Sequence, residues 1–158
     1  MLLKDANKIV ELLKKYNLTV STAESCTGGL LSGAITAVSG SSEVFNAGIV
    51  TYSNEAKMKY LQVKKDTLDK YGAVSEETAR EMAEGIAKVN QAQVGVSVTG
   101  VAGPGGGTPE KPVGMVCFGF SICGKVTTFI KQFGNLGRNQ VRDASVRFVL
   151  EKLIELLA

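Results

Sequence analysis

The hydrophobic positions of the chain follow the two periods that distinguish helices from strands. In residues 5–16, apolar side chains recur every three or four positions and share one face of a predicted helix. Residues 138–157 repeat this pattern and predict the last helix. Another helix is predicted to begin after Ser75, which can cap it, with Glu76 and Glu77 in the first turn, where the helix dipole favours acidic side chains.

Continuous apolar or β-branched runs predict strands between these helices. The five predicted strands cover residues 18–23, 47–52, 92–98, 113–121 and 126–132. Shorter helices are predicted over residues 27–38 and 54–61, and a helix or turn over 67–71. Because helices and strands alternate and are then followed by a hairpin, the sequence predicts a single α/β domain over residues 1–158, with three α/β/α layers and a mixed sheet.

The composition of the chain restricts the groups that could act in catalysis, chiefly because one residue type is missing. The chain has no histidine among its 158 residues. A serine or cysteine nucleophile would therefore need a Lys, Tyr, Asp or Glu side chain as its base. Three cysteines without a C-x-x-C spacing indicate neither a disulfide framework nor a zinc site, and the lack of histidine excludes a histidine-bound metal.

Charge and hydropathy indicate the surroundings of the protein. The formal net charge is +3 and no dense basic run occurs, so no nucleic-acid partner is expected. The first ten residues lack the hydrophobic stretch of a signal peptide. The longest apolar stretch, residues 113–123, is about half as long as a membrane-spanning helix. We therefore expect a cytoplasmic protein without a membrane partner.

The first candidate motif is Thr22-Ala-Glu-Ser-Cys-Thr-Gly-Gly29, between a predicted strand and a predicted helix. Gly28 and the glycine after it allow a sharp turn, and the helix start offers free N–H groups to an anion. Cys26 is a candidate nucleophile if its pKa is lowered there. The simpler interpretation is that Ser25 and Thr27 only cap the helix.

Two further motifs contain the remaining candidate groups. Ser42 follows Gly40 in a predicted tight turn, but it does not match G-x-S-x-G, so a loop or a helix cap is the simpler interpretation. Lys57 lies one helical turn after Ser53 and is the best candidate base in a chain without histidine. For this role it must be buried, because desolvation lowers the pKa of a lysine toward ~7–8.

A loop over residues 100–114 contains all three prolines and a third of the glycines, directly after a predicted strand. Such loops are where α/β folds bind ligands, and their backbone N–H groups can hold a phosphate. Arg138 and Arg142 lie one turn apart at the start of the last helix, where positive charge opposes the helix dipole. Their placement is consistent with a bound anion and equally with a structural ion pair.

Five motifs, in order, resemble one family. They are TAESCTGG, GSS, GIVTYSNEAK, GAVSEETA and VTGVAGPGGGTPEKPVG. Together they are similar to the C-terminal domain of the competence-damage protein CinA, whose stand-alone bacterial form is a nicotinamide-nucleotide amidase. The resemblance runs from about residue 5 to the C-terminus. It does not extend to the N-terminal domain of full-length CinA proteins, which favours the stand-alone form.

The resemblance implies hydrolysis of nicotinamide mononucleotide (NMN) to nicotinic acid mononucleotide and ammonia, by a Ser–Lys pair without a metal or cofactor. It implies that Ser42 is the nucleophile and Lys57 its base, with Ser25 and Tyr52 as supporting groups. Glu24 or Glu43 would suit the positive pyridinium ring. The residues that the resemblance places around the substrate are Gly28, Thr99, Gly100, Gly103, Gly105, Gly106, Arg138 and Arg142.

Without the resemblance, the residues do not distinguish Ser25, Cys26 and Ser42 as nucleophiles. A non-enzymatic binding module associated with competence or DNA damage is the alternative function. A third is an amidase of the Ser-Ser-Lys type acting on another carboxamide, although its long Gly/Ser-rich signature is absent. A homo-oligomer is expected, with the hydrophobic strands of residues 113–132 as its interface.

Overall fold

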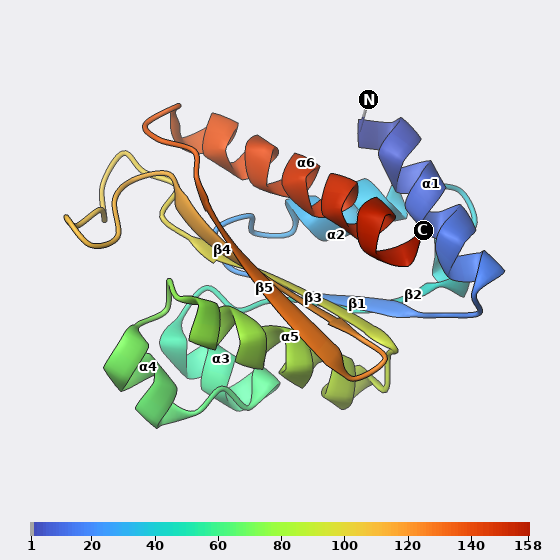
Figure 1. The fold of residues 1–158 in the computed structure, drawn as a ribbon, viewed down its shortest axis with the longest axis horizontal. Coiled ribbons are helices and arrows are strands. Elements are labelled where there is room, and N and C mark those ends of the chain that lie inside the picture. The colour runs from blue at the N-terminus through green and yellow to red at the C-terminus, as the bar shows by residue number, and fades with distance from the viewer. Residues whose placement is uncertain (1) are drawn as a thin grey trace.

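The computed structural model describes residues 2–158 and contains a five-stranded sheet between two layers of helices (Figure 1). The strands are β1 Val20–Glu24, β2 Phe45–Val50, β3 Val94–Gly100, β4 Met115–Ile122 and β5 Lys125–Gln132. They lie in the order β2-β1-β3-β4-β5. β1 pairs in parallel with both β2 and β3, whereas β3–β4 and β4–β5 are antiparallel pairs. The sheet is therefore mixed, as predicted.

Three helices cover each face of the sheet, which confirms the predicted three-layer fold. One layer contains α1 Leu2–Lys15, α2 Leu30–Thr36 and α6 Arg138–Leu157 (Figure 1). The other contains α3 Asn54–Leu61, α4 Lys65–Tyr71 and α5 Glu76–Asn90. A short 3-10 helix, η1, covers Ser41–Glu43 just before β2. None of the helices within residues 2–158 has the length and apolar character needed to cross a membrane.

Most predicted elements agree with the structure. Two helix starts illustrate one agreement and one difference. Ser75 caps α5 as expected, because its hydroxyl accepts a hydrogen bond from the N–H of Thr78 at 3.1 Å. The predicted helix over 27–38 instead begins only at Leu30. Gly28 and Gly29 before it have φ angles of 56° and 107°, which a right-handed helix does not use.

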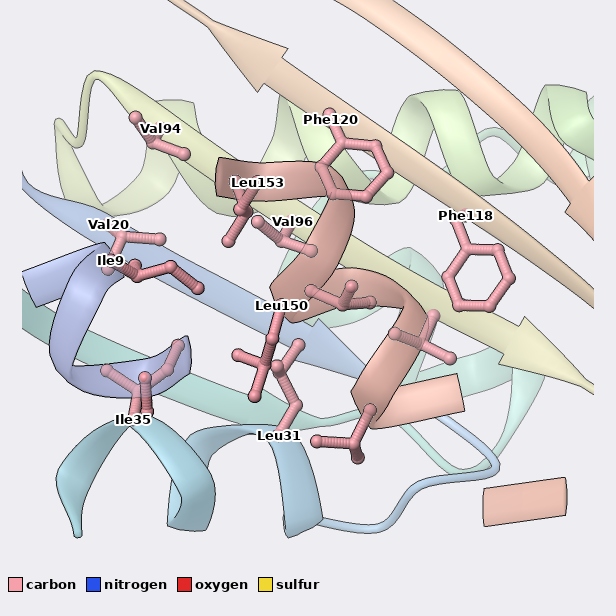
Figure 2. Packing of buried hydrophobic residues seen from close by; sticks show 14 of the residues in the cluster. Ile9, Val20, Leu31, Ile35, Val94, Val96, Phe118, Phe120, Leu150 and Leu153 are labelled. Atoms are coloured by element: carbon pink, nitrogen blue, oxygen red, sulfur yellow. The ribbon is translucent and has the colours of Figure 1, made fainter. Parts of the chain in front are cut away.

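The main hydrophobic core lies between the sheet and the layer of α1, α2 and α6 (Figure 2). Its fully buried members include Ile9, Leu31, Val96, Phe118 and Leu150. Burying each such side chain stabilises the folded state by roughly 1.5–3 kcal/mol. The strands are therefore held in place as a rigid frame. β4 lies inside this frame with seven of its eight residues buried. Of the interface expected over residues 113–132, the edge strand β5 and the turn before it are thus accessible, whereas β4 is not.

On the other face of the sheet, α3 packs unusually closely against α5. A Cβ atom at Gly85 of α5 would lie 1.9 Å from the carbonyl oxygen of Leu61, the last residue of α3. Only glycine fits there, because real Cβ contacts are never this short. The absence of a side chain at Gly85 therefore allows α3 to lie this close to α5.

Candidate active site

A cavity of about 310 Å³ opens at the carboxyl ends of the parallel strands. It is formed by the β1–α2 turn, the residue pair after β2, the loop after β3 and the start of α6. The residues lining it are Ser25, Cys26, Tyr52, Val74, Gly100, Val101, Ala102, Gly103, Gly105, Gly106 and Arg138. A larger surface hollow, around Arg80 and Cys123, contains none of the predicted site residues.

Ser25 and Lys57 meet at this end of the sheet. Ser25 is the first residue after β1, and its N–H donates to the carbonyl of Val98 in β3 at 2.9 Å. Lys57 lies in α3 and is only 1% exposed. Its Nζ donates to Ser25 Oγ at 3.2 Å and to the carbonyl oxygen of Thr51 at 2.8 Å. The structure thus holds a buried lysine amine against a serine hydroxyl at the cavity.

Burial changes the acid–base properties of Lys57. Desolvation lowers its pKa from 10.5 to about 8. At pH 7 roughly a tenth of such a lysine is neutral and able to accept a proton. A buried lysine with a lowered pKa is what the sequence analysis required for Lys57 to act as a general base. The helix that positions it begins at Ser53, whose hydroxyl accepts a hydrogen bond from the N–H of Ala56 at 3.1 Å.

The structure does not form the expected pair of Ser42 and Lys57. Ser42 lies in η1, exposed, before the first residue of β2. β1 and β2 are parallel, with Val20 opposite Phe45. Ser42 is therefore at the end of the sheet away from Ser25, separated by the length of β2, about 20 Å at ~3.3 Å per residue. The serine that contacts Lys57 is therefore Ser25 and not Ser42. The parallel order of β1 and β2 explains this, because it places the residues that follow both strands at the same end of the sheet.

Cys26 lines the cavity beside Ser25 but is poorly suited to be a nucleophile. The side chain is buried, and desolvation raises the pKa of its thiol to about 12. The thiolate, which is the reactive form of cysteine, is therefore scarce at neutral pH. Among the three candidate nucleophiles of the sequence, only Ser25 has both a position at the cavity and a base.

Arg138 connects two walls of the cavity. Its Nη1 donates to the carbonyl oxygen of Gly103 in the glycine-rich loop at 2.8 Å. Its Nη2 donates at 2.8 Å to the hydroxyl of Tyr52, a side chain that is 62% exposed and follows β2. A guanidinium at this position places positive charge at the edge of the cavity.

Arg142, one turn later in α6, is directed elsewhere. Its Nε donates to the carbonyl of Cys26 at 3.1 Å, and its Nη2 to the carbonyl of Thr27 at 3.4 Å. Arg142 is not among the residues that line the cavity, and neither is Gly28, whose added Cβ would meet Arg142 Nη2 at 3.4 Å. The structure thus separates two arginines that the sequence treats alike.

The glycine-rich loop contributes its backbone rather than side chains. The N–H groups of Gly103, Gly105 and Gly106 have no hydrogen-bond acceptor within residues 2–158, so they are free donors beside the cavity. Thr99, expected at the substrate, is 1% exposed, and its hydroxyl donates to the carbonyl of Ala73 at 2.8 Å. This bond ties the end of β3 to the segment before α5 and does not face the cavity.

The two acidic residues expected near a pyridinium ring do not lie at the cavity. Glu24 is fully buried and accepts hydrogen bonds from the N–H of Leu31 at 2.8 Å and of Ser32 at 3.0 Å. It stabilises the start of α2, a role that the sequence analysis missed. Glu43 forms an ion pair with Lys14 at 3.6 Å, at the far end of the sheet. Within residues 2–158, no group of three or more metal-binding side chains gathers anywhere.

Comparisons with known proteins place this geometry in a family. The model of the CinA C-terminal domain matches residues 3–157. A CinA-like protein of Kosmotoga olearia is 56% identical over 143 residues, and a putative competence-damage inducible protein of Clostridium novyi is 56% identical over 144. Each match covers 90% of this chain but 34% of the relative. The chain thus spans about a third of the length of these curated relatives.

Solved structures show the same fold along nearly the whole chain. The competence/damage inducible protein CihA from Agrobacterium tumefaciens is 46% identical with a TM-score of 0.96, covering 99% of this chain and 96% of that one. A CinA superfamily protein from Escherichia coli is 36% identical with a TM-score of 0.95, covering 99% and 90%. With a family model that matches almost every residue, the conclusion is direct: the chain belongs to the CinA C-terminal domain family.

Proposed function

We propose that this chain hydrolyses the carboxamide of nicotinamide mononucleotide, releasing ammonia and nicotinic acid mononucleotide. Ser25 is the nucleophile and Lys57 its general base. The observation that supports this most strongly is the buried Lys57 amine at 3.2 Å from the Ser25 hydroxyl. A lysine with its pKa lowered to about 8 can take a serine proton in a protein without histidine.

The proposed reaction proceeds in two steps. Lys57 removes the proton of Ser25, whose oxygen forms a bond to the carboxamide carbon while the carbonyl oxygen becomes an oxyanion. The C–N bond then breaks, and the proton held on Lys57 leaves with the nitrogen as ammonia. In the second step, Lys57 takes a proton from water, whose oxygen attacks the acyl carbon. The Ser25 ester bond breaks, the serine oxygen takes the proton from Lys57, and the acid product is released and loses its remaining proton to solvent as it becomes a carboxylate.

Groups around the cavity suit the remaining parts of a nucleotide. The free N–H groups of Gly103, Gly105 and Gly106 and the guanidinium of Arg138 are donors for phosphate or ribose oxygens. The cavity volume, about 310 Å³, lies at the lower end of the ~300–1,000 Å³ usual for small-molecule sites. This volume suits a small ligand such as a mononucleotide.

The test is ammonia release by the purified chain from NMN, NAD, free nicotinamide and glutamine, each measured separately. We expect turnover of NMN well above that of nicotinamide, which lacks the ribose phosphate. Lys57→Met, which keeps the length of the side chain and removes its amine, should be inactive and controls for contaminating amidases. If NMN is not hydrolysed, or if Lys57→Met is as active as the unmodified chain, the proposed function is wrong.

The names of the curated relatives motivate a second candidate, a non-enzymatic module associated with competence or DNA damage. The Ser25–Lys57 contact argues against it. Burying an ionisable amine lowers stability, and a site that only binds has no need of that cost. An inactive chain that still binds NMN would favour this second candidate.

A further inference from the structure

Arg142 reaches from α6 to the turn that follows the proposed nucleophile. Its Nε and Nη2 donate to the carbonyls of Cys26 and Thr27, at 3.1 and 3.4 Å. The third nitrogen, Nη1, donates to Oδ1 of Asn139 at 3.1 Å. All three guanidinium nitrogens therefore have acceptors within the protein, and the planar fork is matched to two successive carbonyls of one turn.

Arg142 is one of several groups that hold this turn: the hydroxyl of Thr27 donates to Glu24 at 2.6 Å and its carbonyl accepts from the N–H of Leu30 at 3.0 Å. The carbonyl of Cys26, next to Ser25, is held by Arg142 Nε. The turn runs from Ser25 into Gly28 and Gly29, and both glycines have positive φ angles, a conformation that side chains disfavour. A peptide group is planar and trans, so its carbonyl and N–H point in opposite directions. Holding the Thr27 carbonyl consequently orients the N–H of Gly28, which donates to the carbonyl of Ser25 itself at 3.1 Å. This series of contacts leads from Arg142 to Ser25.

The contacts of Arg142 are made to backbone and amide groups. It lies in the second turn of α6. No carboxylate forms an ion pair with it among the salt bridges of residues 2–158. Its contacts are instead to backbone carbonyls beside Ser25.

We propose that Arg142 is a positioning residue for Ser25, holding the Cys26–Thr27 turn so that the serine hydroxyl stays within reach of Lys57. This inference rests on the proposed amide hydrolysis at Ser25. It assigns different tasks to the two arginines of α6. Arg138, at the cavity, contributes to substrate affinity, whereas Arg142, which does not line the cavity, contributes to the rate of the chemical step.

The experiment measures kcat and KM for NMN in Arg142→Ala and Arg142→Lys. A displaced nucleophile reacts about 100-fold more slowly, so kcat of Arg142→Ala should fall by that order while KM stays within about twofold. Free guanidinium ion, at concentrations far below those that denature proteins, should restore part of the kcat of Arg142→Ala. Arg142→Lys should also lose kcat, because an ammonium cannot hold both carbonyls in the same plane. Arg80→Ala, on α5, is the matched control and should behave as the unmodified chain.

A second measurement separates this proposal from the choice of substrate. The rate at which a fluorophosphonate labels Ser25 reports activation of the serine without any NMN. We expect slower labelling in both Arg142 variants, with thermal melting confirming that they are folded. If the unmodified chain is labelled but does not hydrolyse NMN, and the Arg142 variants are labelled more slowly, then NMN is not the substrate but Arg142 still positions Ser25. A raised KM with unchanged kcat, unchanged labelling, or no labelling of the unmodified chain would overturn the proposal for Arg142.

Discussion

Ser25 and Ser42 lie at opposite ends of the parallel strands β1 and β2, and each has a lysine in its surroundings. Beside Ser25, Lys57 is 1% exposed and contacts the hydroxyl directly. Beside Ser42, the side chain of Lys14 is 41% exposed and pairs with Glu43. Both ends thus contain a glycine turn, a serine and an amine. They differ in burial, which leaves the side chain of Lys14 in contact with solvent and lowers the pKa of Lys57.

The comparison shows that residue types alone do not identify a catalytic serine in this fold. The carboxyl end of β1 contributes Ser25 to a cavity, because parallel strands direct their following turns to the same edge of the sheet. The amino end of β2 contributes Ser42 to an exposed 3-10 turn. A lysine with a lowered pKa lies beside a serine only at the end where α3 buries Lys57.

The largest expected effect distinguishes the two serines. Ser25→Ala should lower kcat for NMN by at least ~10³-fold, because removing a nucleophile that acts as a unit with its base leaves only binding and electrostatic assistance. Ser42→Ala should leave kcat and KM unchanged within about twofold. Ammonia release measures both. If Ser42→Ala is the inactive variant and Ser25→Ala is active, then Ser42 and not Ser25 is the nucleophile.

A smaller effect is expected at the phosphate side of the cavity. Arg138→Ala should raise KM for NMN by roughly 10–100-fold, the value of a hydrogen bond to a charged group, with a modest change in kcat. Steady-state kinetics measure this. Free nicotinamide, which has no phosphate, is the control substrate and should be insensitive to the substitution. An unchanged KM for NMN would show that the phosphate binds elsewhere.

The pH profile examines the burial of Lys57 directly. Only the neutral amine accepts the serine proton, so kcat/KM should rise about tenfold per pH unit below the lowered pKa of about 8 and level off above it. A stopped assay across pH 6–9.5 measures the curve. A base with the ordinary lysine pKa of about 10.4 would give a profile that still rises at the upper limit. A flat profile over the whole range would contradict Lys57 as the base.

The smallest effect is expected at Cys26, which lines the cavity next to Ser25. Burial raises the pKa of this thiol to about 12, so its contribution is packing. Cys26→Ala should change kcat/KM by less than about threefold, measured on NMN. Loss of activity in this variant, together with an active Ser25→Ala, would make the thiol the nucleophile.

Periodicity and caps were sufficient to predict most of the fold. α3 and α6 have the predicted bounds, and the hydroxyl of Ser75 caps α5 as its place in the sequence indicates. These features are local, because they depend on neighbours three or four residues away. α2 shows the limit of local patterns, since two glycines with positive φ delay its start to Leu30.

The site was less predictable, because its geometry depends on the order of strands in space. Lys57 was predicted to be the base by exclusion, since the chain has no histidine, and the structure shows that this lysine is buried. Its partner was misassigned, because nothing within the GSS motif shows at which end of the sheet it lies. Arg138 and Arg142 differ by a single turn of α6, and only the structure shows that one faces the cavity and the other the Cys26–Thr27 turn.

The lack of a side chain at Gly85 decides how deeply Lys57 is held. The carbonyl of Leu61, four residues after Lys57 in an eight-residue helix, rests on that glycine. A methyl group at position 85 would move the end of α3 outward, and the amine of Lys57 would move with it. A descendant sequence that replaces Gly85 would therefore need a rebuilt α3 to keep Lys57 beside Ser25, so position 85 affects the proposed chemistry without taking part in it.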